Sequence, residues 1–376
     1  MLIIRAQRVF DGRELTGKRA VVVSGGKIVE LLDDAPESGD VRDLGDVTLL
    51  PGLIDTHVHL AFDASPDPIA GLDRPGLYDR MRAHARTHLA AGVTTVRDLG
   101  DRDYLALRLA NAMTDGPEIL SAGAPITSVG GHCWFLGGEA EGVEGVRKAV
   151  RERADKGAHA IKMMITGGEM TPGSPSHLNQ FTREEIDAAA DEAHRHGLPI
   201  AGHAHGGPGI AAAVAAGFDS VEHVTFLTED SVEPDPAIMA AMAANGVAAS
   251  LTVGVLPGFT PPPRIAALLP ILGESLRMLY GSGVTIVGGS DSGIGPTKPH
   301  GILTHGGDML TMAGMTPVEI LRAFTSDAAR VCRVETRKGR IAPGFDADLL
   351  AVRGDPTSDH TALRNTAAVF RNGASL

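Results

Sequence analysis

The sequence predicts an α/β protein, a (β/α)8 TIM barrel that carries a small β-sandwich domain built from both termini. Two observations lead to this prediction. Helical segments alternate with short apolar runs from residue 51 to residue 331, and side chains suited to metal chemistry stand near the ends of several runs. In such a barrel the C-terminal strand ends surround one mouth, where residues far apart in sequence converge. A doubly wound open sheet is the rival, disfavoured because the candidate residues come from the first strand, the last strand and several between.

The two ends of the chain have a pattern of their own. Residues 1–50 and 332–376 contain short strand-like runs separated by glycine and charged turns. Neither end is long enough to bury its own core well, so we expect both to pair into one composite β-sandwich domain. Residues 51–331 then form the catalytic barrel domain. Two separate extensions are the alternative, which the apolar content of both ends disfavours.

The alternation in the middle of the chain can be counted. Seven units follow the first apolar run, and in each a helical segment leads through a glycine into an apolar, β-rich run, as expected for a parallel sheet covered on both faces. Thr182 and Glu185 have the spacing of a capping box. The seven glycines are Gly92, Gly116, Gly157, Gly197, Gly217, Gly246 and Gly283. The eight runs lie at 53–60, 93–100, 117–123, 158–166, 198–205, 218–226, 247–254 and 284–291, and eight strands close such a barrel.

Composition excludes several classes of function. The formal net charge of −12 argues against nucleic acid or an anionic membrane surface as the main partner. The N-terminus reaches charged residues too soon for a signal peptide, and no apolar run approaches the length of a membrane span. Cys133 and Cys332 offer neither a disulfide framework nor a thiolate zinc site, so we expect a cytoplasmic protein with a small-molecule substrate. The oligomeric state stays open, with a homo-oligomer among the outcomes.

Histidines at strand spacing give the main indication of chemistry. His57 and His59 are separated by one residue, so both point to the same face of a strand. His203 and His205 repeat this spacing, and His223 follows on the next run. A lone histidine is more often a core residue than a ligand, but a pair at the end of a barrel strand favours a ligand. Neutral imidazole binds zinc, and catalytic zinc sites leave a position open for water.

Lys162 and Asp291 extend this set. Lys162 lies in the apolar run AIKMMIT, where an unpaired ammonium is unfavourable. It is either a structural lysine paired with a carboxylate, or a buried amine with a lowered pKa that reacts with carbon dioxide to form a carbamate able to bridge two cations. Spacing alone does not establish that modification. Asp291, in GGSDSG, can contact a metal and take a proton from water.

Together these residues lie in motifs that resemble the metal-dependent amidohydrolase superfamily. The similarity covers nearly the whole chain and is strongest to the branch of prolidase-like dipeptidases, imidazolonepropionase-related proteins and ochratoxinase-like carboxypeptidases. The ordered set is specific, although the pattern His-x-His alone would be weak. The motifs are PGLIDTHVHL, IKMMITGG, GHAHG, DSVEHVTF, GGSDSG and KGRIAPGFDADLLAV.

The resemblance implies two divalent metal ions, with Zn2+ expected. Lys162, carboxylated by CO2, would bridge both ions. His205 would be a catalytic contact to the substrate or transition state rather than a ligand, and His132, in VGGHCW, a further substrate contact. The more buried ion would be bound by His57, His59 and Asp291, and the more exposed one by His203 and His223.

Other groups have weaker assignments. His300 and His305 follow the last strand in a loop, where either could line the pocket and bind substrate. The run TPPPR at 260–264 is expected to form a rigid loop or a lid. Arg97 and Asp98 are expected to form a buried ion pair near the mouth. Four histidines on predicted helices are expected at the surface: His84, His88, His194 and His196.

The implied reaction is hydrolysis of an amide-type carbon–nitrogen bond, in a dipeptide or an N-acyl amino acid. Two cations lower the pKa of a bridging water, the resulting hydroxide attacks a polarised carbonyl, and Asp291 carries its proton to the leaving nitrogen. No cysteine nucleophile is needed, since no Cys–His spacing supports Cys133 in that role. One alternative is a hydrolytic deaminase or a cyclic amide (ring-opening) hydrolase of the same superfamily, and Lys162 counts against a mononuclear deaminase. The last is a non-catalytic scaffold, which would be expected to lack the metal ligands.

Overall fold

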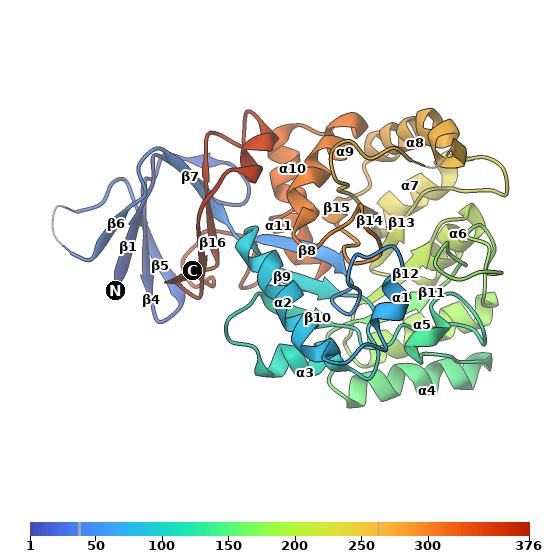
Figure 1. The fold of residues 1–376 in the computed structure, drawn as a ribbon. Helices are drawn as coiled ribbons and strands as arrows, with labels where there is room; N and C mark the ends of the chain where they lie inside the picture. The colour runs from blue at the N-terminus through green and yellow to red at the C-terminus, as the bar shows by residue number, and fades with distance from the viewer. Residues whose placement is uncertain (37–38, 262) are drawn as a thin grey trace.

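Eight parallel strands in the middle of the chain form the scaffold that carries the site. They are seen in a computed structural model that describes residues 1–36, 39–261 and 263–376 (Figure 1). Each strand falls within one of the predicted apolar runs, and almost all strand residues are buried. The strands are β8 (Leu53–Val58), β9 (Val93–Asp98), β10 (Glu118–Ser121), β11 (Ile161–Met164), β12 (Ile200–Ala204), β13 (Ser220–His223), β14 (Ala248–Thr252) and β15 (Ile286–Gly289).

The strands make two parallel sheets, with orders β10-β9-β8 and β11-β12-β13-β14-β15 in the described part of the chain. Backbone bonds link the sheets at both junctions. The Asp291 amide, just after β15, donates to the His57 carbonyl on β8 over 2.7 Å. The Met164 amide on β11 donates over 2.8 Å to the carbonyl of Ile126, in the segment after β10. The fold is α/β and TIM-barrel-like, with the carboxyl ends of the strands on one side.

Helices connect the strands and cover them. The capping box of Thr182 and Glu185 is confirmed at the start of α5. Six of the seven predicted helix-ending glycines have positive φ; Gly116 does not, because α3 has already ended at Ala112. None of the helices within the described ranges is long and apolar enough to cross a membrane. The helices are α1 (Pro68–Gly71), α2 (Leu77–Ala90), α3 (Leu105–Ala112), α4 (Gly142–Asp155), α5 (Arg183–Arg195), α6 (Gly207–Ala216), α7 (Pro236–Asn245), α8 (Pro263–Gly281), α9 (Gly306–Ala313), α10 (Pro317–Ala323) and α11 (Ser326–Val331).

Strands from both termini lie together at one end of the molecule, where the N and C labels stand in Figure 1. One sheet has the order β5-β4-β1-β6 and the other β18-β17-β16-β7-β2-β3. A buried apolar cluster draws on both sheets, with Ile4 and Val21 from the first and Leu49, Leu349 and Phe370 from the second. The strands are β1 (Leu2–Arg5), β2 (Arg8–Phe10), β3 (Leu15–Thr16), β4 (Ala20–Ser24), β5 (Lys27–Leu32), β6 (Val41–Asp43), β7 (Val47–Pro51), β16 (Leu349–Arg353), β17 (Thr366–Arg371) and β18 (Ala374–Ser375).

A charged network ties the terminal segments to the start of a barrel strand. Glu118, the first residue of β10, accepts a hydrogen bond from Arg337 over 2.8 Å and lies 3.1 Å from Lys338 Nζ. Lys338 also pairs with Asp348 and lies 3.1 Å from Asp346. The network lies at the N-terminal end of β10, away from the carboxyl ends of the strands.

Candidate metal centre

The predicted metal-binding side chains meet at the carboxyl ends of five strands. Five of the six predicted ligands form two clusters together with His205, which was expected to contact substrate, and within each cluster the possible ligand atoms lie within 4.8 Å of one another. The clusters consist of His57, His59 and Asp291, and of His203, His205 and His223. Lys162, on β11, lines the same cavity. Convergence from β8, β11, β12, β13 and the segment after β15 is what parallel strands around one mouth produce.

Three hydrogen-bond acceptors face one another in the first cluster. His57 Nδ1 lies 2.9 Å from a carboxylate oxygen of Glu222. His59 Nδ1 lies 3.1 Å from the carbonyl oxygen of Gly100. Both partners only accept, so each ring carries its proton on Nδ1 and a lone pair on Nε2. The two Nε2 atoms are 3.2 Å apart, and Asp291 Oδ1 lies 3.5 and 3.4 Å from them.

This arrangement is suited to a cation at its centre. Lone pairs aimed at one point repel each other unless positive charge lies between them. In a tetrahedral site with bonds of about 2.0–2.1 Å, neighbouring ligand atoms are about 3.3 Å apart, close to the separations seen here. Although burial alone would raise it, the pKa of Asp291 lies well below its ordinary value, and the nearby Lys298 ammonium is one of the groups that lower it, so the carboxylate is ionised. The first cluster therefore fits a divalent metal ion.

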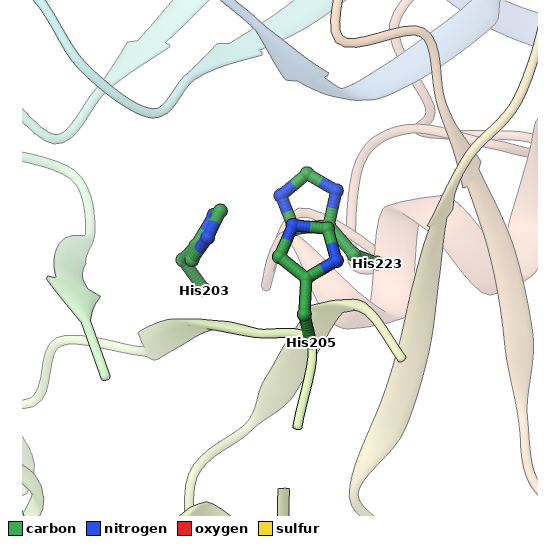
Figure 2. A group of neighbouring side chains, drawn as sticks. All are labelled: His203, His205 and His223. Atoms are coloured by element: carbon green, nitrogen blue, oxygen red, sulfur yellow. The ribbon is translucent and has the colours of Figure 1, made fainter. Parts of the chain in front are cut away.

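Figure 2 shows the second cluster, whose three imidazole rings have centroids 4.4–4.7 Å apart. His203 Nε2 donates to the Gly167 carbonyl over 2.9 Å, which leaves the lone pair on Nδ1. Burial and neighbouring histidines lower the pKa of His203 and of His223 well below the ordinary value. Burial lowers the pKa of His205 to about 4. All three rings are therefore neutral near pH 7, and His205 lies close enough to the other two to be a third ligand of this cluster.

Lys162 has the environment of a reactive amine. Its side chain is fully buried, and among the described residues its Nζ has no hydrogen-bond partner. The structural interpretation, a lysine paired with a carboxylate, lacks that partner. Burial lowers the pKa of Lys162 to about 8, although Glu222 and Asp291 oppose the shift. A fraction of the amine is then uncharged near neutral pH, which is the form that reacts with CO2.

A buried relay behind His57 was not predicted. Arg97 Nη2 donates to Glu222 Oε1 over 3.0 Å, and the other oxygen of Glu222 accepts from His57. Although burial alone would raise it, Arg97 and His57 bring the pKa of Glu222 down to about 2. The expected pair of Arg97 with Asp98 is wrong, because Asp98 accepts from the Leu60 and Gly100 amides instead. Adjacent strand residues point to opposite faces. The carboxylate just before His223 in DSVEHVTF was the available signal.

The cavity over these clusters has a volume of about 220 Å³. Its wall includes His132, whose ring centroid lies 4.7 Å from that of His203 and whose pKa burial lowers to about 3. Cys133 lies beside it, and burial raises the pKa of that thiol to about 12, so it is not a thiolate. Apolar side chains complete the wall: Phe62, Met164, Met170 and Ile294.

Two predicted pocket residues lie elsewhere. Within the described ranges neither His300 nor His305 is part of this cavity wall. His300 Nε2 instead donates to the Phe62 carbonyl over 2.9 Å, and its ring stacks on His84. The segment predicted as a rigid loop or lid, 260–264, is not a loop throughout, because Pro263 and Arg264 begin α8. Pro262 lies outside the described residues, and a lid role stays a prediction.

The expected surface position of the helix histidines holds for two of four. His194 and His196 are exposed. His84 is half-buried, and the expectation is wrong for His88, which is completely buried. Residues Met81, Ala85, His88 and Leu89 share the buried face of α2, so helical periodicity carried a signal for His88.

The chain is similar in sequence and in structure to known proteins. The amidohydrolase family model matches residues 48–375. Ochratoxinase of Aspergillus niger is 29% identical over 365 residues, covering 85% of this chain and 73% of the relative. Imidazolonepropionase of Paracoccus denitrificans is 28% identical over 342 residues, covering 82% and 80%. The crystal structure of a Xaa-Pro dipeptidase with bound methionine matches with a TM-score of 0.86 at 29% identity, covering 100% of this chain and 99% of that one.

Proposed function

This chain belongs to the amidohydrolase family, as its motifs indicated, and from that premise we propose that it is a binuclear metal-dependent hydrolase. Family and relatives support a hydrolase of amide-type bonds. The substrate we propose is a dipeptide or an N-acyl amino acid. One observation carries the proposal: the Nε2 lone pairs of His57 and His59 and the ionised carboxylate of Asp291 all converge on one point.

The donors present fit two divalent ions, for which Zn2+ is our proposal. Neutral imidazoles and a carboxylate are ordinary zinc ligands. Lys162, carboxylated by CO2, would bridge the two ions, and its buried, unpartnered Nζ supports that role. One ion would be held by His57, His59 and Asp291, and the other by His203 and His223, with His205 near enough to join.

Residues of the cavity would then share the work of hydrolysis. When bound, the cations lower the pKa of an attacking water and polarise the substrate carbonyl. Asp291 would accept the proton of that water and deliver it to the leaving nitrogen as the carbon–nitrogen bond breaks, releasing an acid and an amine. His205 and His132 would hydrogen-bond the substrate at the wall. Glu222 would keep the proton of His57 on Nδ1, which leaves Nε2 free as a ligand.

The cavity wall bears on the choice of substrate. Its apolar side chains suit a hydrophobic acyl or amino-acid side chain. Lys162 is the sole lysine or arginine of the wall in the described part of the chain. A substrate carboxylate therefore finds no guanidinium there, and this observation favours a neutral cyclic amide, opened by hydrolysis, as the second candidate substrate.

We also propose the domain organisation expected from the sequence. Residues 51–331 would form a closed (β/α)8 catalytic barrel, and residues 1–50 with 332–376 one β-sandwich domain. The bonds at both sheet junctions and the apolar cluster shared by the terminal sheets support this division. A cytoplasmic location and a small-molecule substrate, with neither nucleic acid nor membrane as partner, remain proposals. A homo-oligomer remains one of the possible assemblies.

A metal count combined with a substrate screen tests the proposed function. Zinc-loaded protein is expected to hold about two ions per chain by elemental analysis, and to hydrolyse dipeptides or N-acyl amino acids. Neutral cyclic amides belong in the same screen, because turnover confined to them would select the second candidate. Chelation should abolish turnover, and added metal should restore it. One ion per chain, with no gain from added metal, would contradict the binuclear site.

A further inference from the structure

A second group of histidines lies behind the mouth. Among the described residues, these histidines are not part of the cavity wall. His88, on α2, is completely buried, and its Nε2 lies 3.1 Å from Ser292 Oγ and 3.2 Å from His300 Nδ1. The other nitrogen of His300, Nε2, lies 2.9 Å from the Phe62 carbonyl oxygen. None of these contacts was expected from the sequence.

The Phe62 carbonyl determines the direction of these bonds. A carbonyl oxygen only accepts, so His300 Nε2 carries the hydrogen and His300 Nδ1 is an acceptor. His88 Nε2 faces that acceptor and must therefore be the donor. Burial lowers the pKa of His88 to about 3 and that of His300 well below its ordinary value, so each ring carries a single proton. The N–H group of His88 consequently points at Ser292 Oγ and His300 Nδ1.

Ser292 is the neighbour of a residue in an unfavourable backbone conformation. Asp291 has a φ of +55°, a left-handed value that residues with a side chain rarely adopt and that persists only where the surroundings enforce it. On the other side of Asp291, the Ser290 amide donates to Asp55 Oδ1 over 2.8 Å. The Asp291 amide itself donates to the His57 carbonyl. The turn is thus anchored on both flanks, by Asp55 at Ser290 and by His88 at Ser292.

We propose that His88 is a positioning residue for Asp291. Resting on the proposed function, in which Asp291 is ligand and proton acceptor, the role of His88 is to hold Ser292 and so keep the Asp291 carboxylate aimed at His57 and His59. His88 touches neither substrate nor metal in this role. Loss of its Nε2 donor should weaken both proton transfer and metal binding while leaving substrate contacts in place.

Substitutions that replace only one of the two ring nitrogens of His88 should have different effects. Nδ1 has no hydrogen-bond partner in the described residues, and it lies 3.9 Å from Asp55 Oδ2, too far for a hydrogen bond. Only Nε2 should matter. A glutamine amide extends to about the position of Nε2, whereas an asparagine amide extends only to that of Nδ1. His88→Gln should therefore retain the function that His88→Asn and His88→Phe lose.

The experiment uses full-length, zinc-loaded protein and the best amide substrate of the screen. In His88→Phe and His88→Asn we expect kcat to fall about 10–100-fold, the usual effect of removing a group that orients a metal ligand, with KM changed less than about twofold. Zinc affinity, measured by competition with a chelator, should weaken over the same range. His88→Gln should stay within about threefold of wild type in both measurements.

His84→Asn is the matched control on the same helix. His84 Nδ1 donates to the carbonyl of Leu60, the neighbour of His59, over 2.8 Å, and an asparagine amide, which extends to the position of Nδ1, keeps that hydrogen bond. We expect its kcat and zinc affinity to match wild type. Ser292→Ala removes the hydroxyl with little change in volume, and it should reproduce the loss even where His88→Phe fails to fold.

Equal values of kcat and zinc affinity in the glutamine and asparagine variants would overturn the inference, as would wild-type values in Ser292→Ala. Those results, found alongside normal zinc uptake and turnover by the wild type, would leave the proposed function intact. A wild-type protein that takes up no zinc and hydrolyses no amide would overturn the proposed function, and the role of His88 with it.

Discussion

Two buried lysines stand under opposite conditions in this molecule. Lys162, at the mouth, is fully buried, and its Nζ has no hydrogen-bond partner within the described ranges. Lys338, in the segment between α11 and β16, is buried as well, yet its Nζ pairs with Asp348 and lies 3.1 Å from both Glu118 and Asp346. A buried lysine amine thus has no described hydrogen-bond partner at one end of the strands and several carboxylate partners at the other.

The difference between these two lysines distinguishes a residue suited to chemistry from one that stabilises the fold. A buried ammonium is unfavourable unless anions replace its hydration. Lys338 has those anions at the N-terminal end of β10, the side of a TIM barrel where contacts serve stability. At the carboxyl ends, where active sites of this fold lie, Lys162 has no hydrogen-bonded anion among the described residues, although Glu222 and Asp291 act on its charge from farther away. An isolated buried amine is therefore better explained by its reactivity than by any contribution to folding.

Lys162→Ala should produce the largest effect. Without a bridging carbamate we expect one or both metal ions to be lost and turnover to be abolished. The folded protein should be at least as stable as wild type, because an unpaired buried amine is removed. Metal content, turnover and a urea unfolding curve on one preparation check this. Short carboxylic acids with bicarbonate should restore part of the activity, and full metal content with full turnover would show that Lys162 is structural.

Asp291→Asn separates proton transfer from metal binding at the mouth. General acid–base catalysis contributes roughly 10²–10⁴-fold, so kcat should fall by that factor while the fold is kept. Metal content should fall less than in His57→Asn or His59→Asn, because an amide oxygen still ligates weakly. Near-native turnover at full metal load would rule out the proton-transfer role.

His205→Asn is the companion variant, because His205 lies within reach of His203 and His223. If His205 contacts substrate, turnover should fall while metal content stays at two ions. Loss of metal in His205→Asn would instead identify it as a ligand of the second cluster. Steady-state kinetics and elemental analysis on the same protein distinguish these roles.

Lys338→Met should destabilise the fold without affecting metal content or kcat, which is the reverse of what we expect for Lys162→Ala. Removing one partner of a buried charged group leaves carboxylates unpaired, and we expect the free energy of unfolding to fall by about 3 kcal/mol. Metal content and kcat should match wild type below the unfolding transition. Lys27→Met is the matched control: Lys27 pairs with Asp346 but is half exposed, so a loss of only about 0.5 kcal/mol is expected. Equal losses of unfolding free energy in Lys338→Met and Lys27→Met would contradict the stabilising role of the buried Lys338.

Local patterns predicted the strands and the meeting of the histidines. Eight apolar runs and the alternation around His57 and His59 are properties of short segments, and parallel topology does the rest. Pairings between strands were not predictable in this way. Arg97 was assigned to its sequence neighbour Asp98, whereas its partner is Glu222, more than a hundred residues away. His88 was within reach of prediction, because its spacing from Met81 and Ala85 places it on the buried face of α2.

Acid should weaken the Lys338 end of the molecule. Although burial alone would raise it, Arg337 and Lys338 bring the pKa of Glu118 down to about 2 from an ordinary 4.5. A carboxylate whose folded pKa is depressed stabilises the fold above its unfolded pKa, and this contribution disappears as the pH falls through the folded pKa. The stabilisation by Glu118, about 3 kcal/mol, should be complete above about pH 4.5 and lost by about pH 2.

Glu118→Gln isolates this contribution from the protonation of the proposed metal ligands, which wild type and variant share. The difference in unfolding free energy between wild type and Glu118→Gln, measured in urea at equal zinc load, should be constant near neutral pH and shrink between about pH 4.5 and 2. Glu118 lies at the N-terminal end of β10, remote in sequence from the clustered histidines, so kcat of the variant at pH 7 should be unchanged. A difference that does not vary with pH would mean that Glu118 acts through packing, and the charged network would then lose its role as the stabilising counterpart of the unpaired Lys162.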